Sequence, residues 1–190
     1  MIAALFCRED SAYKKRLFFD VYDINRDAKT YTGNGPAICH PPCRSWGQLS
    51  HMSNPREGEK ELAPWSLDLV RRIGGIVEHP KGSRIWKLEG MPPGDMLIDS
   101  FGGFTVLLDQ RAFGHVAHKM TRFYICGISI DQLPEVPDTP TEKPTRSICG
   151  NVKGTKRCTQ YQREYTPELL IDWLELICYM IIYNKTKEKK

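Results

Sequence analysis

Cysteines are present in this sequence, but none are spaced as a Cys-x-x-Cys pair. The seven cysteines stand at positions 7, 39, 43, 126, 149, 158 and 178 of the 190 residues. An odd number without paired spacing argues against a disulfide framework, so we expect reduced thiols. Cys39, His40 and Cys43 could contribute to a zinc site. Structural zinc normally needs a second paired cluster, however, so we predict no metal and keep zinc as the minor alternative.

Long hydrophobic segments are also missing. The densest apolar stretch, Leu176–Tyr183, is far shorter than the roughly 20 residues that a membrane span requires. The first apolar stretch, Ile2–Cys7, is followed at once by three charged residues and does not read as a signal peptide. We therefore expect a soluble, cytoplasmic protein without membrane contacts.

The net charge of the chain is small, but the charged residues are unevenly distributed. The net charge is +4, and residues 143–190 hold ten Lys or Arg against five Asp or Glu, while the remainder holds 17 against 18. A basic C-terminal segment on a nearly neutral body suits an acidic polymer such as nucleic acid. The alternative is that the terminal lysines only keep the protein soluble.

Short apolar runs alternate with helix-like segments along the chain, and we predict that each run is a strand. The runs are Ile2–Phe6, Phe18–Tyr22, Ala37–Cys39, Ile76–Val77, Phe104–Leu108 and Arg122–Cys126. Continuous apolar runs are typical of strands buried on both faces. The pattern predicts an α/β fold, a Rossmann-like mainly parallel sheet with helices on both faces and a site at its carboxyl edge.

Two segments have the polarity of helices. Glu61–Ile73 has acids before it, arginines at its end and a glycine after it. Thr166 and Pro167 predict the start of a second helix, as cap and first helical residue. One face of that helix repeats every four residues and is predicted to pack on the core: Leu169, Trp173, Ile177 and Ile181.

Prolines and charge divide the chain into three predicted parts. Residues 1–133 form the core, residues 134–165 a proline-rich and basic linker, and residues 166–190 a helix packed on the core with a basic tail. Within the linker, Lys153, Lys156 and Arg157 lie near two glycines. We expect a flexible loop there that contacts phosphates.

Several motifs follow one another in the order found in DNA cytosine-C5 methyltransferases. The first strand is followed by Asp23-Ile24-Asn25-Arg26-Asp27-Ala28, which resembles that family's acidic signature. Pro41-Pro42-Cys43 resembles its nucleophile loop, and Glu78-His79-Pro80 resembles its glutamate motif. The segment from Phe113 to Gly127 is similar to its later basic segment. The motif order also resembles that of short bacteriophage and prophage proteins, which implies the cytoplasm of a bacterial host.

The resemblance implies a pyrimidine-modifying enzyme with Cys43 as nucleophile, Glu78 as acid and Lys119 as the remaining basic group. It implies S-adenosylmethionine as cofactor, held by Phe6, Asp10, Asp23 and Pro41, with Asp23 bonding the ribose. The chemistry needs these residue types, because a thiolate must add to C6 of cytosine and a carboxyl near N3 must relieve the charge that develops there. Arg44 next to Cys43 should favour the thiolate.

Purely structural roles are the alternatives for Cys43 and Glu78, since a lone cysteine is often a small buried hydrophobic residue and a glutamate is often a surface acid. The chain also departs from the family: it has no glycine between Cys7 and Ser11, and Arg44 replaces the usual glutamine. The large recognition domain is replaced by a linker and about one helix. A second hypothesis is therefore an inactive member of this fold that binds nucleic acid or a host defence or restriction protein.

Overall fold

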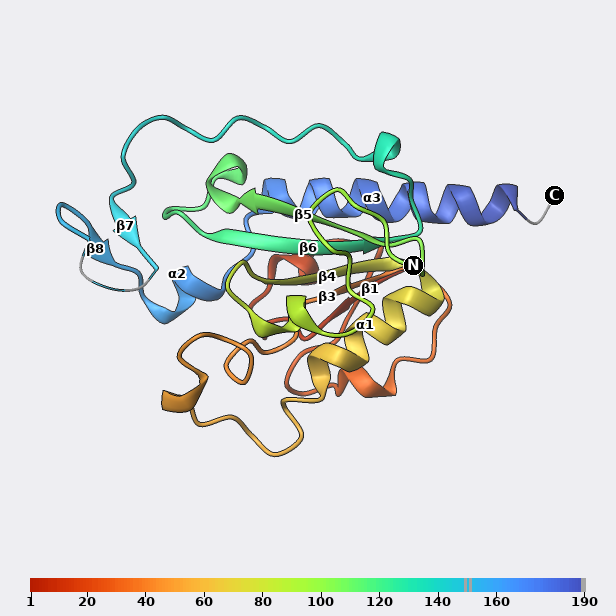
Figure 1. The fold of residues 1–190 in the computed structure, drawn as a ribbon, viewed down its shortest axis with the longest axis horizontal. Coiled ribbons are helices and arrows are strands. Elements are labelled where there is room, and N and C mark those ends of the chain that lie inside the picture. The colour runs from red at the N-terminus through yellow and green to blue at the C-terminus, as the bar shows by residue number, and fades with distance from the viewer. Residues whose placement is uncertain (149, 151, 189–190) are drawn as a thin grey trace.

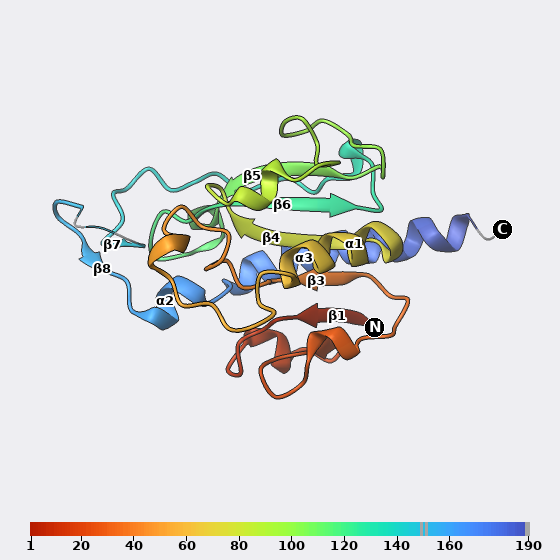
Figure 2. The same cartoon turned by 60° about the horizontal axis from the view of Figure 1, so that its bottom comes forward.

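The computed structural model describes residues 1–148, 150 and 152–188. One sheet is built from strands β1 (Ile2–Leu5), β2 (Phe19–Val21), β3 (Ala37–Cys39), β4 (Gly75–Pro80), β5 (Phe104–Asp109) and β6 (Met120–Cys126). Their order across the sheet is β2-β1-β3-β4-β6-β5 (Figures 1 and 2). Short 3-10 helices lie at Ala12–Lys15, Ala28–Thr30, Ser50–Met52, Arg84–Lys87, Gln110–Phe113 and Ile130–Gln132.

The sheet is mainly parallel, as the sequence predicts. β1 pairs in parallel with β2 and β3, and β3 pairs in parallel with β4, whereas β6 is antiparallel to both β4 and β5. The chain first moves from β1 to β2 on one side and then returns to β3 on the other. Such a reversal opens a crevice at the carboxyl ends of the two strands that flank it, which here are β1 and β3.

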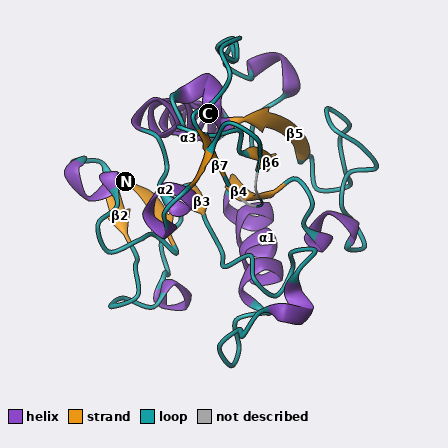
Figure 3. Ribbon diagram, turned by 90° about the vertical axis from the view of Figure 1, so that its left-hand side faces the viewer, coloured by secondary structure: helices purple, strands orange, loops and turns teal. Residues whose placement is uncertain are grey.

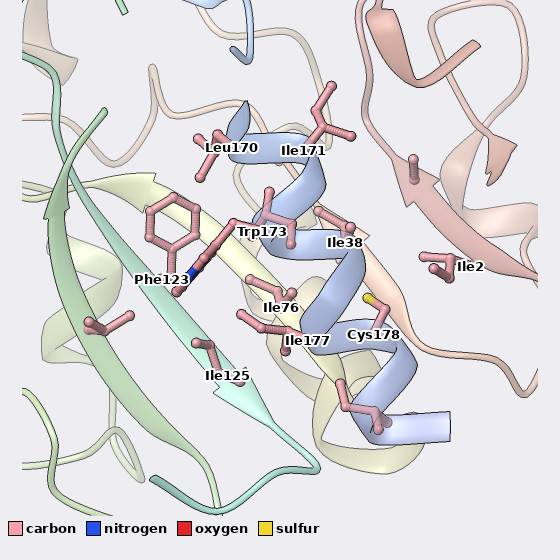
Figure 4. Packing of buried hydrophobic residues seen from close by; sticks show 14 of the residues in the cluster. Ile2, Ile38, Ile76, Phe123, Ile125, Leu170, Ile171, Trp173, Ile177 and Cys178 are labelled. Atoms are coloured by element: carbon pink, nitrogen blue, oxygen red, sulfur yellow. The ribbon is translucent and has the colours of Figure 1, made fainter. Parts of the chain in front are cut away.

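Alternate residues of each strand enter two separate cores. Ile2 and Ala4 belong to a cluster with α3 (Glu168–Lys187), while Ala3 and Leu5 belong to a cluster with α1 (Leu62–Ile73). Alternate side chains of a strand point in opposite directions, so α1 and α3 pack against different sets of strand residues (Figure 3). Figure 4 shows Trp173, Ile177 and Cys178 of α3 packed against Ile38 and Ile76 of the sheet.

The start and the buried face of α3 differ from the prediction. Pro167 is the N-cap and Glu168 the first helical residue, so Thr166 is not the cap. Leu169 is 59% exposed and was wrongly assigned to the core, where Leu170 lies instead. A repeat of four overshoots the 3.6-residue turn by about 40° per step, so three steps back from Ile181 end about 120° away from the core.

Residues 134–165 are more structured than a linker. After an extended proline-rich stretch, β7 (Arg146–Ser147) pairs with β8 (Lys156–Arg157), and α2 (Gln160–Glu164) follows. Thr159 and Gln162 form a capping box that fixes the start of α2. Lys156 and Arg157, expected in a flexible loop, are thus paired in a short strand. Within the described residues, no helix is both long and apolar enough to cross a membrane.

Candidate active site at the carboxyl edge of the sheet

A cavity of about 1050 Å³ opens at the carboxyl ends of β1, β3 and β4. Its walls come from the segment after β1, the loop after β3, the end of β4, the turn before β6 and the region around α2. This volume is at the upper end of what small-molecule sites occupy. The predicted catalytic residues Cys43, Glu78 and Lys119 all line it.

The loop after β3 presents Cys43. Two prolines hold the backbone extended, and the carbonyl of Cys43 accepts hydrogen bonds from Trp46 N (3.0 Å) and Gly47 N (2.9 Å), which fix the following turn. Cys43 is an exposed residue, but partial desolvation of its thiol on the cavity wall, together with the charge of Glu78, raises the pKa of Cys43 above its usual value. Arg44 opposes this rise, but its guanidinium pairs with Glu59 (2.8 Å). The expected activation of the thiolate by Arg44 is therefore not achieved in the free protein.

Strand register places His40 beside Glu78. Cys39 of β3 is paired with Val77 of β4, so the next residue of each strand comes side by side. His40 Nδ1 lies 3.2 Å from Glu78 Oε2, and His40 Nε2 lies 3.0 Å from the hydroxyl of the fully buried Tyr13. The histidine thus links the 3-10 helix after β1 to the end of β4.

A second bond holds the other oxygen of Glu78. Gln110 Nε2 donates to Glu78 Oε1 (3.3 Å) and to Thr121 Oγ1 (3.0 Å). We call Tyr13, His40, Glu78, Gln110 and Thr121 the inner network. Its members come from the 3-10 helix after β1, the loop after β3, β4 itself and the β5–β6 hairpin. Four segments of the chain thus position one carboxylate.

The inner network keeps Glu78 ionised. Burial raises the pKa of Glu78, but the hydrogen bond from His40 and the charge of Lys119 act against it, and the pKa falls to about 2. In the free site Glu78 is therefore a hydrogen-bond acceptor. The predicted role as an acid that donates a proton is not what this arrangement presents.

Lys119 completes the predicted catalytic set. It stands immediately before β6, and its Nζ lies 3.5 Å from the carbonyl of Tyr165 at the end of α2. Its charge favours the ionised forms of both Glu78 and Cys43. A thiol, a carboxylate and a cation thus share one cavity.

The four predicted cofactor residues are not brought together. Phe6, Asp10 and Pro41 line the cavity, but Asp23 is not among the residues of its walls. The Asp23 carboxylate pairs with Lys14 and accepts from Asn25 N (2.9 Å), and the bond with Lys14 lowers the pKa of Asp23. The acid predicted to hold a ribose is already engaged elsewhere.

The segment after β1 does not fit S-adenosylmethionine as the resemblance implies. Phe6 adopts a left-handed backbone conformation (φ 60°) that glycine would accommodate more easily, and its ring packs edge-on against Trp65. Arg8, two residues further on, forms ion pairs with Asp10 (2.8 Å) and with Glu164 of α2. With the ribose acid also occupied, we assign no step to this cofactor.

The three residues considered as zinc ligands have different environments. Cys39 is fully buried, His40 belongs to the inner network, and Cys43 faces the cavity. Among the described residues, no group of three or more His, Cys, Asp or Glu side chains could hold a metal ion. Cys149 lies outside the described residues.

Sequence reasoning missed several parts of the site. Tyr13 and Gln110 were not singled out, and His40 was considered only as a zinc ligand. The α2 region adds Tyr161 and Tyr165, whose rings stack at 5.6 Å on the cavity wall. The capping box before α2 was the one local signal that could have revealed this wall.

Comparison with known proteins assigns no family. No protein-family model matches the sequence, and no curated protein matches it at a significant level. The resemblance to cytosine-C5 methyltransferases stays a prediction from motif order. Function must therefore be inferred from the chemistry of the cavity rather than from the fold.

Proposed function

We propose that this protein is a pyrimidine-modifying enzyme in which Cys43 adds to C6 of a base in a nucleotide or a single-stranded nucleic acid. One observation carries the proposal: Cys43, Glu78 and Lys119 line the same cavity at the carboxyl edge of the sheet. A base in a duplex would have to be extruded to enter, because its ring faces are stacked.

The proposed step needs only the protein, the base and water. The Cys43 thiol gives its proton to water, and the thiolate pair forms an S–C6 bond while the C5–C6 π pair moves onto C5 and the adjoining ring atoms. Lys119 stabilises the negative charge that develops. C5 then takes a proton from water. Loss of the original C5 proton and departure of the thiolate restore the ring, so the net result is exchange of the C5 hydrogen.

Hydrogen exchange at C5 in heavy water therefore tests the proposal. Uridine and cytidine monophosphates and short single-stranded oligonucleotides would be incubated with the protein, and loss of the H5 signal followed by NMR. We expect exchange that Cys43→Ala abolishes and Cys7→Ala retains, since Cys7 is a second thiol on the same cavity. No exchange with any substrate, or full exchange with Cys43→Ala, would refute the proposal.

A second candidate is a non-catalytic protein that binds nucleic acid or a host defence protein. It is favoured by the ion pairs that occupy Asp23 and the segment after β1, and by the raised pKa of the Cys43 thiol. Calorimetry that detects tight binding of S-adenosylmethionine would contradict this candidate. Oligonucleotide binding without C5 exchange would support it.

A further inference from the structure

The surroundings of Glu78 consist of hydrogen-bond donors and a cation. His40 Nδ1 approaches one carboxylate oxygen and Gln110 Nε2 the other, and Lys119 lines the same cavity. An ionised carboxylate offers about four acceptor sites, so two bonds leave acceptor capacity free. The Glu78 side chain is 15% exposed, and this exposed part is available to a ligand in the cavity.

Tyr13 fixes the direction of the hydrogen bonds. If the Tyr13 hydroxyl donates to His40 Nε2, neutral His40 carries its proton on Nδ1 and donates to Glu78. A doubly protonated His40 would donate to Tyr13 instead, and the hydroxyl proton would need another acceptor at a fully buried position. The chain of bonds therefore runs from Tyr13 through His40 and ends on Glu78 as an acceptor.

If Cys43 adds to C6 as proposed, the acceptor role of Glu78 discriminates between pyrimidines. In a six-membered pyrimidine ring the atom opposite C6 is N3, so a ring held between Cys43 and Glu78 presents N3 to the carboxylate. Uracil carries N3–H, a donor, whereas the N3 of cytosine is a bare acceptor. An acceptor facing an acceptor leaves both groups unpaired, which costs affinity when they are buried.

We infer that the site selects a uracil-type ring, one that carries N3–H, over cytosine. Glu78 accepts the N3–H bond, and Lys119 is the donor for a neighbouring ring carbonyl. Sites built to bond a particular N–H or O–H reject analogues that lack it more strongly than apolar pockets reject a methylene. This inference rests on the proposed function but narrows its substrate from pyrimidines in general to uracil.

Binding to the Cys43→Ala variant tests the inference without interference from covalent reactivity. Calorimetry would compare uridine, cytidine and 3-methyluridine monophosphates, together with the deoxy forms of the first two. We expect uridine monophosphate to bind at least about tenfold more tightly than cytidine monophosphate, and the N3-methyl group to abolish that advantage. Equal or tighter binding of cytidine monophosphate, or unchanged binding of the N3-methyl analogue, would overturn the inference.

Two further variants locate the preference. Glu78→Gln in the Cys43→Ala background can turn either an oxygen or an NH₂ toward N3, so we expect the uridine preference to fall to within about twofold. Glu164→Gln, an acid on the rim of the same cavity, should keep it. Exchange of H5 on cytidine monophosphate alone would refute uracil selection while leaving Cys43 addition intact. Failure of every nucleotide to bind or exchange would refute both.

Discussion

The two sides of the cavity are built differently. The inner network joins buried groups by directional hydrogen bonds, with Tyr13 fully buried and Glu78 nearly so. On the other side, Arg8 pairs with Asp10 and with Glu164, and the pair Lys14–Asp23 lies just outside the cavity walls. We call these three the outer ion pairs; in each of them at least one partner is substantially exposed. Exposed pairs of this kind contribute little to stability, whereas a buried network is costly to disturb.

This contrast bears directly on function. The inner network gives one carboxylate a fixed charge and a fixed hydrogen-bond role, which is what a site that orients a ring requires. The outer ion pairs occupy the place where the resemblance puts a cofactor. The proposed base recognition therefore rests on one side of the cavity, and the other side offers no matching set of residues for S-adenosylmethionine.

The largest expected effect concerns His79, which lies fully buried next to Glu78 and bonds Ser83 (2.7 Å). Burial lowers the pKa of His79 from 6.5 to about 4, against the opposing charge of Glu78. Between these values the unfolded chain binds the proton more readily, so stability falls as pH drops from 6.5 to 4. The loss over this window is about 3 kcal/mol, measured by urea unfolding.

The control for this prediction is His79→Gln, which should flatten the profile between pH 6.5 and 4.5. Glu78 acts in a lower window: its pKa is depressed from 4.5 to about 2, so the stability it contributes is present above 4.5 and is lost as pH falls toward 2. Parallel profiles for the wild type and His79→Gln would contradict a neutral buried histidine.

Tyr13→Phe tests the inner network by removing one hydroxyl. The variant leaves the partly buried His40 Nε2 without the partner that the fully buried Tyr13 supplies, so we expect a loss of about 1–3 kcal/mol in the free energy of unfolding. Tyr31→Phe is the matched control, because its hydroxyl donates to Gly35 O (3.1 Å) from a half-buried ring. Equal losses of stability in the two variants would show that the inner network is no more costly to disturb than a half-buried hydrogen bond outside it.

Replacing Lys153, Lys156 and Arg157 with alanine tests the basic segment around β8. If these exposed side chains contact phosphates, the slope of log affinity against log salt for a single-stranded oligonucleotide should become shallower by about 2. The fold should be unchanged, as judged by circular dichroism. An unaltered slope would assign nucleic-acid contacts to the cavity alone.

Asp23→Asn should have the smallest effect. Because Asp23 is paired with Lys14 and lies outside the cavity walls, nucleotide affinity should stay within about twofold of the wild type. Calorimetry should detect no S-adenosylmethionine binding in either protein. If the wild type binds S-adenosylmethionine and Asp23→Asn does not, Asp23 has the ribose-binding role that the resemblance implies.

The sequence predicted the sheet well, because its strands are buried on both faces and appear as continuous apolar runs. It also predicted that Cys43 and Glu78 would face one cleft, since the carboxyl ends of neighbouring parallel strands share an edge, and both residues line the same cavity. The bonds of Glu78 to His40 and Gln110 were beyond its reach. They depend on the register of β3 against β4 and on the path of the β5–β6 hairpin, which no local pattern encodes.

The buried face of α3 and the unit around α2 were missed for different reasons. Counting in steps of four put Leu169 in the core, whereas the true helical repeat brings in Leu170. β7 and β8 have two residues each, too few for any periodicity. The stacked Tyr161 and Tyr165 reach the cavity through tertiary contacts that no local pattern predicts, such as the stacking of Tyr165 on His115 and the placement of Arg8 over Tyr161.

The central claim is that a pyrimidine ring lies between Cys43 and Glu78. A crystal structure of the Cys43→Ala variant with uridine monophosphate tests it most directly. We predict that N3 faces the Glu78 carboxylate at hydrogen-bond distance, with C6 toward residue 43 and a ring carbonyl near Lys119. A nucleotide bound along the segment after β1, or a ring whose N3 points away from Glu78, would contradict this account.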